Sequence, residues 1–281
     1  MDLNHFNPLK QHPLVSFFML AYGIAWIPLA LQPMIGDVVL SFAFWAPAVS
    51  ALILVAVNGG KSGTQKLVSK LFLWRAGVKW YVIALLSPVV LELLAFATHM
   101  LLGRTPLAID LAAWIEMLPS QLLPLIVVLL FLVLLSTGEE LGWRGYALPE
   151  LQARYGSVWA SLVLGLLWGL WHLPVFWIPG TVQYGLPVPG YIIATVGYSL
   201  IYTCILNGAK GSVLLTSVYH AASNLVLTYG NAIAPAIIHD LYLSLPALAL
   251  VVVAVVFLSG PAVLVGRQSW FSETGRSDAT E

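Results

Sequence analysis

The sequence predicts an all-α fold, a polytopic transmembrane bundle of about eight spanning helices, and three observations lead to that prediction. First, hydrophobic residues make up 60% of the chain and charged residues only 9%, with a mean hydropathy of +0.91. A water-soluble domain cannot hide that much apolar surface, whereas a bilayer solvates it. Second, apolar runs of about 20 residues or more alternate with polar or Pro- and Gly-marked breaks. They lie at 14–35, 38–57, 80–102, 122–149, 158–178, 191–207, 211–230 and 241–265.

The third observation is the distribution of positive charge among the breaks. The break at 58–79 carries Lys61, Lys66, Lys70, Arg75 and Lys79. The positive-inside rule places such a break in the cytoplasm. With eight spans, both termini and every Lys and Arg except Arg104 then fall on the cytoplasmic side. Shifting the count by one helix scatters these charges over both faces, so the bias supports the number of spans as well as their orientation.

The spans form one domain. A single bundle is expected over 14–265, between a cytoplasmic N-terminal segment at 1–13 and a polar cytoplasmic tail at 266–281. The first apolar run is too long for the core of a signal peptide, so we keep it as a permanent helix. We expect an integral membrane protein of a bacterial cell membrane.

Charge and cysteine content exclude other classes of protein. The net charge is zero and the basic residues are scattered among the breaks, so nucleic acid is excluded as a partner. The single cysteine, Cys204, forms no internal disulfide and supplies no thiolate cluster for a metal. The expected partners are the lipid bilayer and a peptide or membrane-protein substrate. The sequence leaves the oligomeric state open.

Three ionisable residues interrupt the fourth apolar run: Glu139, Glu140 and Arg144. Each such residue at bilayer depth costs about 2.5 to 3.5 kcal/mol on insertion scales, so they are rare and usually functional. Glu140 and Arg144 are four residues apart and can pair on one helix face, while Glu139 points about 100° away. This spacing favours a structural pair and a chemically active Glu139. The alternative is that all three lie at the level of the lipid headgroups.

Two histidines lie inside later runs, and each is alone more typical of a helix-to-helix hydrogen bond than of catalysis. His172 follows Trp168 by one turn, and His220 shares a helix face with Asn224. Counted from the cytoplasmic helix ends at 1.5 Å per residue, Glu139 lies ~15 Å deep, His172 ~21 Å and His220 ~14 Å. The depths agree within the error of the helix ends, so we expect one site.

Hydrolysis is the chemistry that these residues permit. A carboxylate flanked by imidazoles can deprotonate water, and His220 with Asn224 can donate hydrogen bonds to the oxyanion formed at a peptide carbonyl. Alternatively, Glu139, His172 and His220 bind Zn²⁺ with an open position for water. The sequence does not separate a metal-free scheme from a zinc scheme. The His-Glu-x-x-His and Gly-x-Ser-x-Gly motifs are absent, and every Asp lies in a break or terminus.

Residues 120–230 resemble the CPBP family, which includes the glutamate-type CAAX prenyl endopeptidases and bacterial relatives linked to bacteriocin immunity or processing. Three motifs carry the resemblance, in order and on separate spans. The second motif of the family begins with Phe, where this chain has Trp and keeps an aromatic wall. The motifs read Glu139-Glu140-Leu-Gly-Trp-Arg144, Trp168-Gly-Leu-Trp-His172 and His220-Ala-Ala-Ser-Asn224.

The resemblance implies an intramembrane endopeptidase that hydrolyses a membrane-associated or lipidated peptide. Glu139 and His172 would activate water, while His220 and Asn224 would stabilise the oxyanion. Arg144 would hold Glu140 and, with Trp168, shape the site. We expect the site to open to the cytoplasm. Metal dependence, prenyl recognition and the physiological substrate stay open, as does the role of Glu92 in the third run.

Two other functions compete with this one. A non-catalytic membrane protein, for peptide binding or bacteriocin immunity, would bind a peptide in the same cavity without cleaving it. A transporter would use the intramembrane Glu and His residues to carry protons. Transport predicts paired repeats or broken helices in both halves, and the sequence contains no convincing repeat.

Overall fold

The computed structural model describes residues 8–36, 38–103, 111–233 and 241–260. This part of the chain contains helices and no strand, as predicted for an all-α fold. In chain order the elements are α1 (Pro8–Gln11), α2 (Pro13–Ala30), α3 (Gln32–Ile35), α4 (Val38–Ala43), α5 (Ala46–Ser69), the 3-10 turn η2 (Lys70–Phe72), α6 (Val78–Leu101), α7 (Leu111–Gly142), the π-helix η3 (Trp143–Ala147), α8 (Leu148–Trp171), the 3-10 turn η4 (Leu173–Trp177), α9 (Val188–Gly208), α10 (Val213–Ile233) and α12 (Leu241–Ser259).

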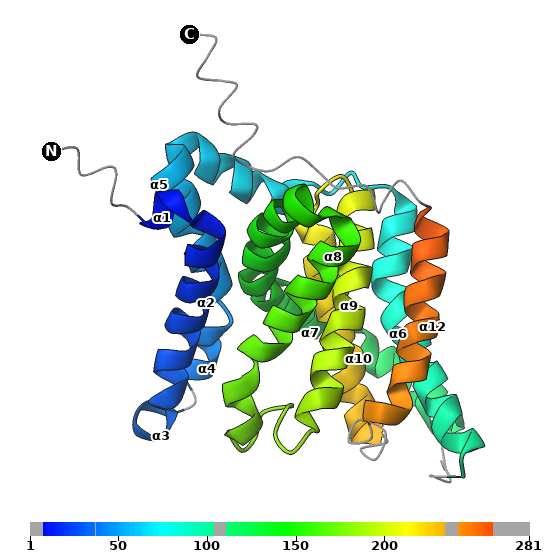
Figure 1. Ribbon diagram of the computed structural model, residues 1–281. Helices are drawn as coiled ribbons and strands as arrows, with labels where there is room; N and C mark the ends of the chain where they lie inside the picture. Colours follow the sequence, from blue (N-terminus) through cyan, green and yellow to red (C-terminus); the bar gives the residue numbers. More distant parts are fainter. Residues whose placement is uncertain (1–7, 37, 104–110, 234–240, 261–281) are drawn as a thin grey trace, which may run out of the picture.

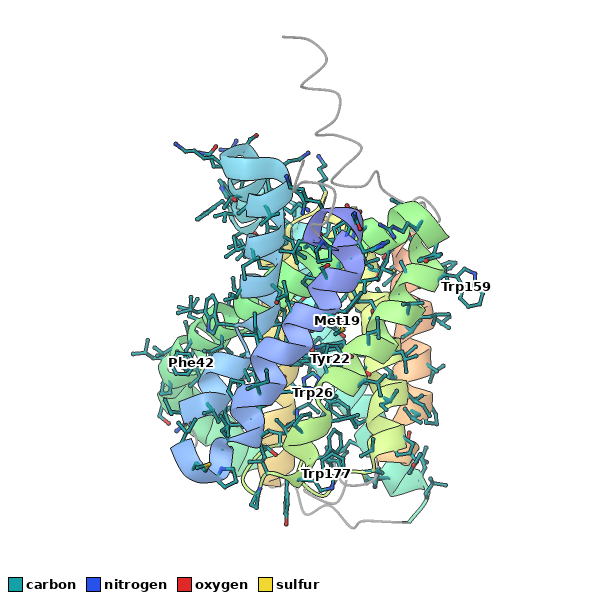
Figure 2. All side chains as sticks on the ribbon, turned by 60° about the vertical axis from the view of Figure 1, so that its left-hand side comes forward. Met19, Tyr22, Trp26, Phe42, Trp159 and Trp177 are labelled. Carbon is teal, nitrogen blue, oxygen red and sulfur yellow. The ribbon has the colours of Figure 1, made fainter. Side chains whose placement is uncertain are left out.

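These helices run side by side as one bundle (Figure 1). Among the described residues, four segments are long and apolar enough to cross a membrane: Pro13–Ala30, Val78–Leu101, Ser120–Trp177 and Val188–Gly208. Each of the eight apolar runs predicted from the sequence contains helix in the structure. Large apolar side chains such as Met19, Phe42 and Trp159 project outward, 66% to 72% exposed, as expected of a surface solvated by lipid (Figure 2).

Two segments differ from the sequence prediction. The run predicted to end at Pro149 stays helical through η3 and the first turns of α8, and it breaks only at Gly156. Gly156 has φ +74° and ψ 167°, a conformation that a residue with a Cβ atom rarely adopts. The predicted break at 58–79 is partly helical, because α5 bends at Gly60 and continues across the end of the bundle (Figure 1).

The two ends of the bundle differ in charge. The end that carries α1, the second half of α5, η2 and the α9–α10 turn is called here the basic end (Figure 1). Its described basic residues are Lys10, Lys61, Lys66, Lys70, Arg75, Lys79, Arg154 and Lys210. The other end, called the distal end, carries α3, η4 and the loop at 178–187.

Some of the charges used in the topology prediction are not described. The side chains of Asp37, Arg104, Asp110, Glu116, Asp240, Arg267 and Arg276 lie outside the described part of the chain, as do residues 1–7 and the predicted tail. The predicted domain limits therefore stay a prediction.

A glycine pair in α7 and a glycine in α8 bring the site helices close to their neighbours. A Cβ atom on Gly138 of α7 would lie 2.7 Å from the carbonyl oxygen of Phe44, and one on Gly142 would overlap Pro47. Likewise, a Cβ atom on Gly165 of α8 would lie 2.6 Å from the Cα of Val196 in α9. Small residues spaced by four let helix backbones approach closely in membranes. These contacts fix the positions of α7 and α8, which carry the first two motifs.

Candidate active site

One cavity of about 410 Å³ lies inside the bundle. Its lining includes Glu139 from α7, His172 from the end of α8, and His220 and Asn224 from α10. The convergence predicted from sequence is therefore confirmed as geometry: residues from three helices meet at one space. Their catalytic roles remain a prediction.

Glu139 is held by an indole. Its side chain is 3% exposed, and its Oε2 accepts a 2.7 Å hydrogen bond from Nε1 of Trp168. No other hydrogen bond to this carboxylate is found within the described residues. One oxygen is thus fixed by α8, and the other is left to accept a proton from a molecule in the cavity.

His172 is fixed in both position and tautomer. Its Nδ1 lies 2.8 Å from the carbonyl oxygen of Trp168. A carbonyl oxygen only accepts, so Nδ1 carries a proton, and in the neutral imidazole Nε2 keeps its lone pair. The rings of Trp168, Trp171 and Tyr191 pack edge-on against the imidazole, with centroids 4.9 to 5.5 Å away. The imidazole therefore presents an acceptor nitrogen at a defined orientation.

His220 is tied to the second glutamate. Its Nδ1 donates to Oε1 of Glu140 at 2.9 Å, and the same oxygen accepts a 2.8 Å bond from Arg144. The Glu140–Arg144 pair predicted from the helix spacing is confirmed, with both side chains 0% exposed. The hydrogen bond between His220 and Glu140 could not be predicted from helix spacing, because the two residues are 80 positions apart.

The guanidinium of Arg144 is enclosed by aromatic rings. It lies 4.4 Å from the ring centroid of Trp168 and 3.7 Å from that of Tyr202. Cations are attracted to aromatic faces, and the attraction strengthens when water is excluded. Arg144 therefore links Glu140, which holds His220, to Trp168, which holds Glu139.

Known proteins resemble this part of the chain. Residues 121–226, which contain all three motifs, match the family model described as Type II CAAX prenyl endopeptidase Rce1-like. A curated relative, CAAX prenyl protease 2 of Methanococcus maripaludis, is 35% identical over 106 residues. That alignment covers 35% of this chain and 38% of the relative. The matched segment is thus similar to the CPBP family. Because the alignment covers only part of each chain, protease activity of this chain is a proposal.

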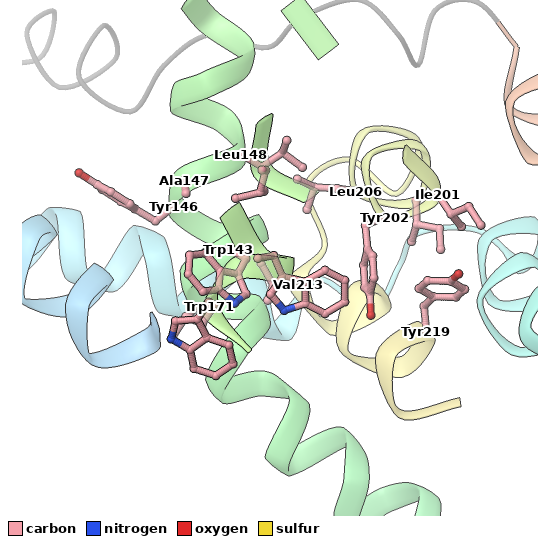
Figure 3. Close-up of a cluster of buried hydrophobic side chains, with 14 of the residues drawn as sticks. Trp143, Tyr146, Ala147, Leu148, Trp171, Ile201, Tyr202, Leu206, Val213 and Tyr219 are labelled. Carbon is pink, nitrogen blue, oxygen red and sulfur yellow. The ribbon is translucent and has the colours of Figure 1, made fainter. Parts of the chain in front are cut away.

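The CPBP segment also contributes the wall between the cavity and the basic end. Trp143, Tyr146 and Leu148, which follow Glu139 along the chain, are each 0% exposed. Trp143 packs against Phe17 and Trp171, with ring centroids 5.3 and 5.8 Å apart. Figure 3 shows Trp143, Tyr146, Leu148 and Trp171 within one buried cluster. The space between the cavity and the basic end is filled with side chains.

The exposed part of the lining lies toward the distal end. It includes Val182, 60% exposed, and Gly180 in the loop after η4, together with Phe44, 37% exposed, and Thr228. The predicted opening to the cytoplasm stays a prediction. The helical path continues past Pro149 to Gly156, so Glu139 lies farther from the basic end than predicted.

Glu92 of α6, whose role the sequence left open, lines the same cavity. None of the residues lining the cavity is Lys or Arg. The lining is otherwise mostly apolar or aromatic, so Glu92 and Glu139 are the carboxylates of this space. Two histidines, His172 and His220, share this space with them.

The residues suggested for zinc do not form a ligand set in this arrangement. No group of three His, Cys, Asp or Glu side chains in the described chain is placed to hold a metal ion. We therefore derive no catalytic step through a metal, and metal dependence is left to experiment.

Proposed function

We propose that this protein is an intramembrane endopeptidase in which Glu139 activates water. The observation that carries the proposal is the state of Glu139: a buried carboxylate with one oxygen held by Trp168, in a cavity shared with two oriented imidazoles. A carboxylate removed from bulk water, with one oxygen left for a water molecule, is suited to general-base catalysis. The family match is consistent with this chemistry.

The first step would form the tetrahedral intermediate. Glu139 takes a proton from water as the water oxygen bonds to the carbonyl carbon of the substrate. Nε2 of His172 accepts a hydrogen bond from the second water proton and so aligns the attack. The carbonyl oxygen becomes an oxyanion, which receives hydrogen bonds from the side-chain amide of Asn224 and from Nε2–H of His220.

The second step would break the peptide bond. The C–N bond cleaves as Glu139 returns its proton to the leaving amine, which regenerates the carboxylate. His220 donates from Nε2 only when its imidazole is doubly protonated. The carboxylate of Glu140, bonded to Nδ1, supports that positive charge. Arg144 keeps Glu140 in place through the i,i+4 bond.

Cleavage of a fluorogenic peptide library, including prenylated peptides, by the purified protein in lipid nanodiscs tests the proposal. Wild type is compared with Glu139→Gln, which keeps the shape of the side chain but removes the base. The matched control is Glu150→Gln, the same change at a buried residue that does not line the cavity. Thermal unfolding of each variant checks that it is folded.

We expect cleavage by wild type and by Glu150→Gln, and none by Glu139→Gln. Equal cleavage by all three proteins would contradict the role of Glu139. Peptide binding without cleavage by folded wild type would favour the non-catalytic or immunity function instead. Each reaction is repeated with a chelator. Activity that is lost on chelation and restored by Zn²⁺ would replace the metal-free route with a metal-dependent one.

A further inference from the structure

The basic end marks one side of the membrane. All the described Lys and Arg residues apart from Arg144 lie there, on α1, the segment from α5 through η2 to the start of α6, the part of α8 before Gly156 and the α9–α10 turn. Lys70 donates to the carbonyl oxygen of Gly145, and Lys79 donates to that of Leu258, so this charged layer packs directly on the bundle. Positive charge in short loops favours the cytoplasmic side.

The cavity is closed toward that side. Every residue from Leu141 to Leu151 is buried. Within this stretch, Trp143 and Tyr146 both pack against Phe17 of α2. Lys70 covers Gly145 from the basic end. A peptide that approached from the lysines would have to displace a packed aromatic cluster, whose close packing resists such a change.

The cavity reaches the surface on the other side. Val182 and Gly180 belong to the distal loop after η4, and Thr228 lies in the distal half of α10. All three are exposed and line the cavity. Trp177, which immediately precedes this loop, marks the distal end in Figure 2.

We propose that the cavity takes its substrate from the non-cytoplasmic side of the membrane. This side of entry, which rests on the proposed peptidase function, implies that the substrate is a polypeptide segment presented at the outer face and not the tail of a cytoplasmic protein. The charged side chains of the lining limit the substrate class further. Glu92 and Glu139 line the cavity, and none of its described lining residues is Lys or Arg, so the cavity favours neutral or cationic residues beside the scissile bond over acidic ones.

Cysteine accessibility in intact cells tests the side of entry. The native Cys204 is buried and is replaced by Ala, after which single cysteines are introduced. Val182→Cys reports on the mouth of the cavity, and its control is Lys61→Cys, an exposed position at the basic end. Each variant is treated with a membrane-impermeant maleimide before and after permeabilisation of the cytoplasmic membrane.

A second pair tests whether the opening leads to the cavity. Ala194 lines the cavity on α9, whereas Ala147 lies in the packed segment between the cavity and the basic end. Both are buried, 8% and 0% exposed, and in both the replacement by Cys adds one thiol group to the side chain. The probe is a small, impermeant, cationic methanethiosulfonate, which suits a lining that contains Glu92 and Glu139.

We expect Val182→Cys and Ala194→Cys to react in intact cells. We expect Lys61→Cys to react only after permeabilisation, and Ala147→Cys to react in neither state. Labelling of Lys61→Cys in intact cells, or of Val182→Cys only after permeabilisation, would overturn the side of entry. An Ala194→Cys that stays unreactive in both states would overturn the opening.

Labelling does not depend on catalysis, so the same variants are also made with Glu139→Gln. The expected labelling pattern without any peptide cleavage would refute the proposed function and leave the side of entry standing. Cleavage by purified wild type together with the reverse labelling pattern would refute only the side of entry.

Discussion

Nε1 of Trp168 donates a 2.7 Å hydrogen bond to Oε2 of Glu139, across two helices and 29 positions of sequence. The motif that this chain resembles has Phe at the position of Trp168, and Phe has no donor for such a bond. In this chain the aromatic wall therefore also orients the proposed base. The presence of Trp in place of Phe thus adds one hydrogen bond to the site.

Trp168→Phe should lower kcat more than it changes KM, because it removes the bond that positions the base, while the smaller ring only adds space at one wall of the cavity. A hydrogen bond to a charged group contributes about 1.5 to 3 kcal/mol, equivalent to roughly 10- to 100-fold in rate. Peptide cleavage in nanodiscs measures both constants. Trp159→Phe, at a lipid-facing residue that is 66% exposed, is the control. Equal kcat for both variants would show that the bond does not assist catalysis.

Asn224→Ala should reduce kcat by roughly 10² to 10³-fold if the amide donates to the oxyanion, the size seen when one such donor is removed. KM should change little, because the bond strengthens only as the oxyanion forms. Asn224→Asp keeps the size of the side chain but replaces the amide donor by a carboxylate, so it should be at least as inactive. A variant with altered KM and normal kcat would instead place Asn224 in ground-state binding.

Arg144→Ala should destabilise the protein by about 3 kcal/mol, because it leaves the carboxylate of Glu140 buried with only His220 as partner. Thermal unfolding in detergent or nanodiscs provides the measurement. Arg154→Ala removes the same charge from an exposed position and should change stability by less than about 0.5 kcal/mol. Matching melting curves for wild type and Arg144→Ala would mean that the ion pair contributes nothing to stability.

Gly142→Ala should lower the melting temperature, because the added methyl group overlaps the backbone of Pro47 and forces α7 away from α5. Overpacking of this kind costs about 1 to 3 kcal/mol. Gly59→Ala is the matched control, since a Cβ atom there meets nothing within 4 Å. Cleavage is measured in parallel, because a shift of α7 also moves Glu139. Equal stability of the two variants would contradict the close approach.

Glu92→Gln should weaken the selection of cationic substrates. The variant removes one of the two carboxylates of the cavity. We expect kcat/KM for peptides with Lys beside the scissile bond to fall about tenfold, which corresponds to ~1.4 kcal/mol, while neutral peptides serve as the internal control. A uniform decrease for both peptides would assign Glu92 to structure, and no change would exclude it from substrate selection.

The sequence by itself determined the membrane bundle and one contact of the site. A chain with 60% hydrophobic residues has no stable alternative to burial in lipid. The Glu140–Arg144 pair follows from helix periodicity, which acts over four residues and needs no knowledge of the other helices. The meeting of Glu139, His172 and His220 was also predictable, because their depths were similar.

Only the tertiary structure decided which side chains bond to one another and where the cavity opens. The Trp168–Glu139 and His220–Glu140 bonds join different helices, so they depend on how each helix is rotated and how closely it packs. Glycine pairs such as Gly138 and Gly142 set that approach through contacts with distant residues. The direction of the opening depended on the turn at Gly156 and on the aromatic packing around Trp143. Sequence periodicity describes one helix at a time, whereas these features are properties of several helices packed together.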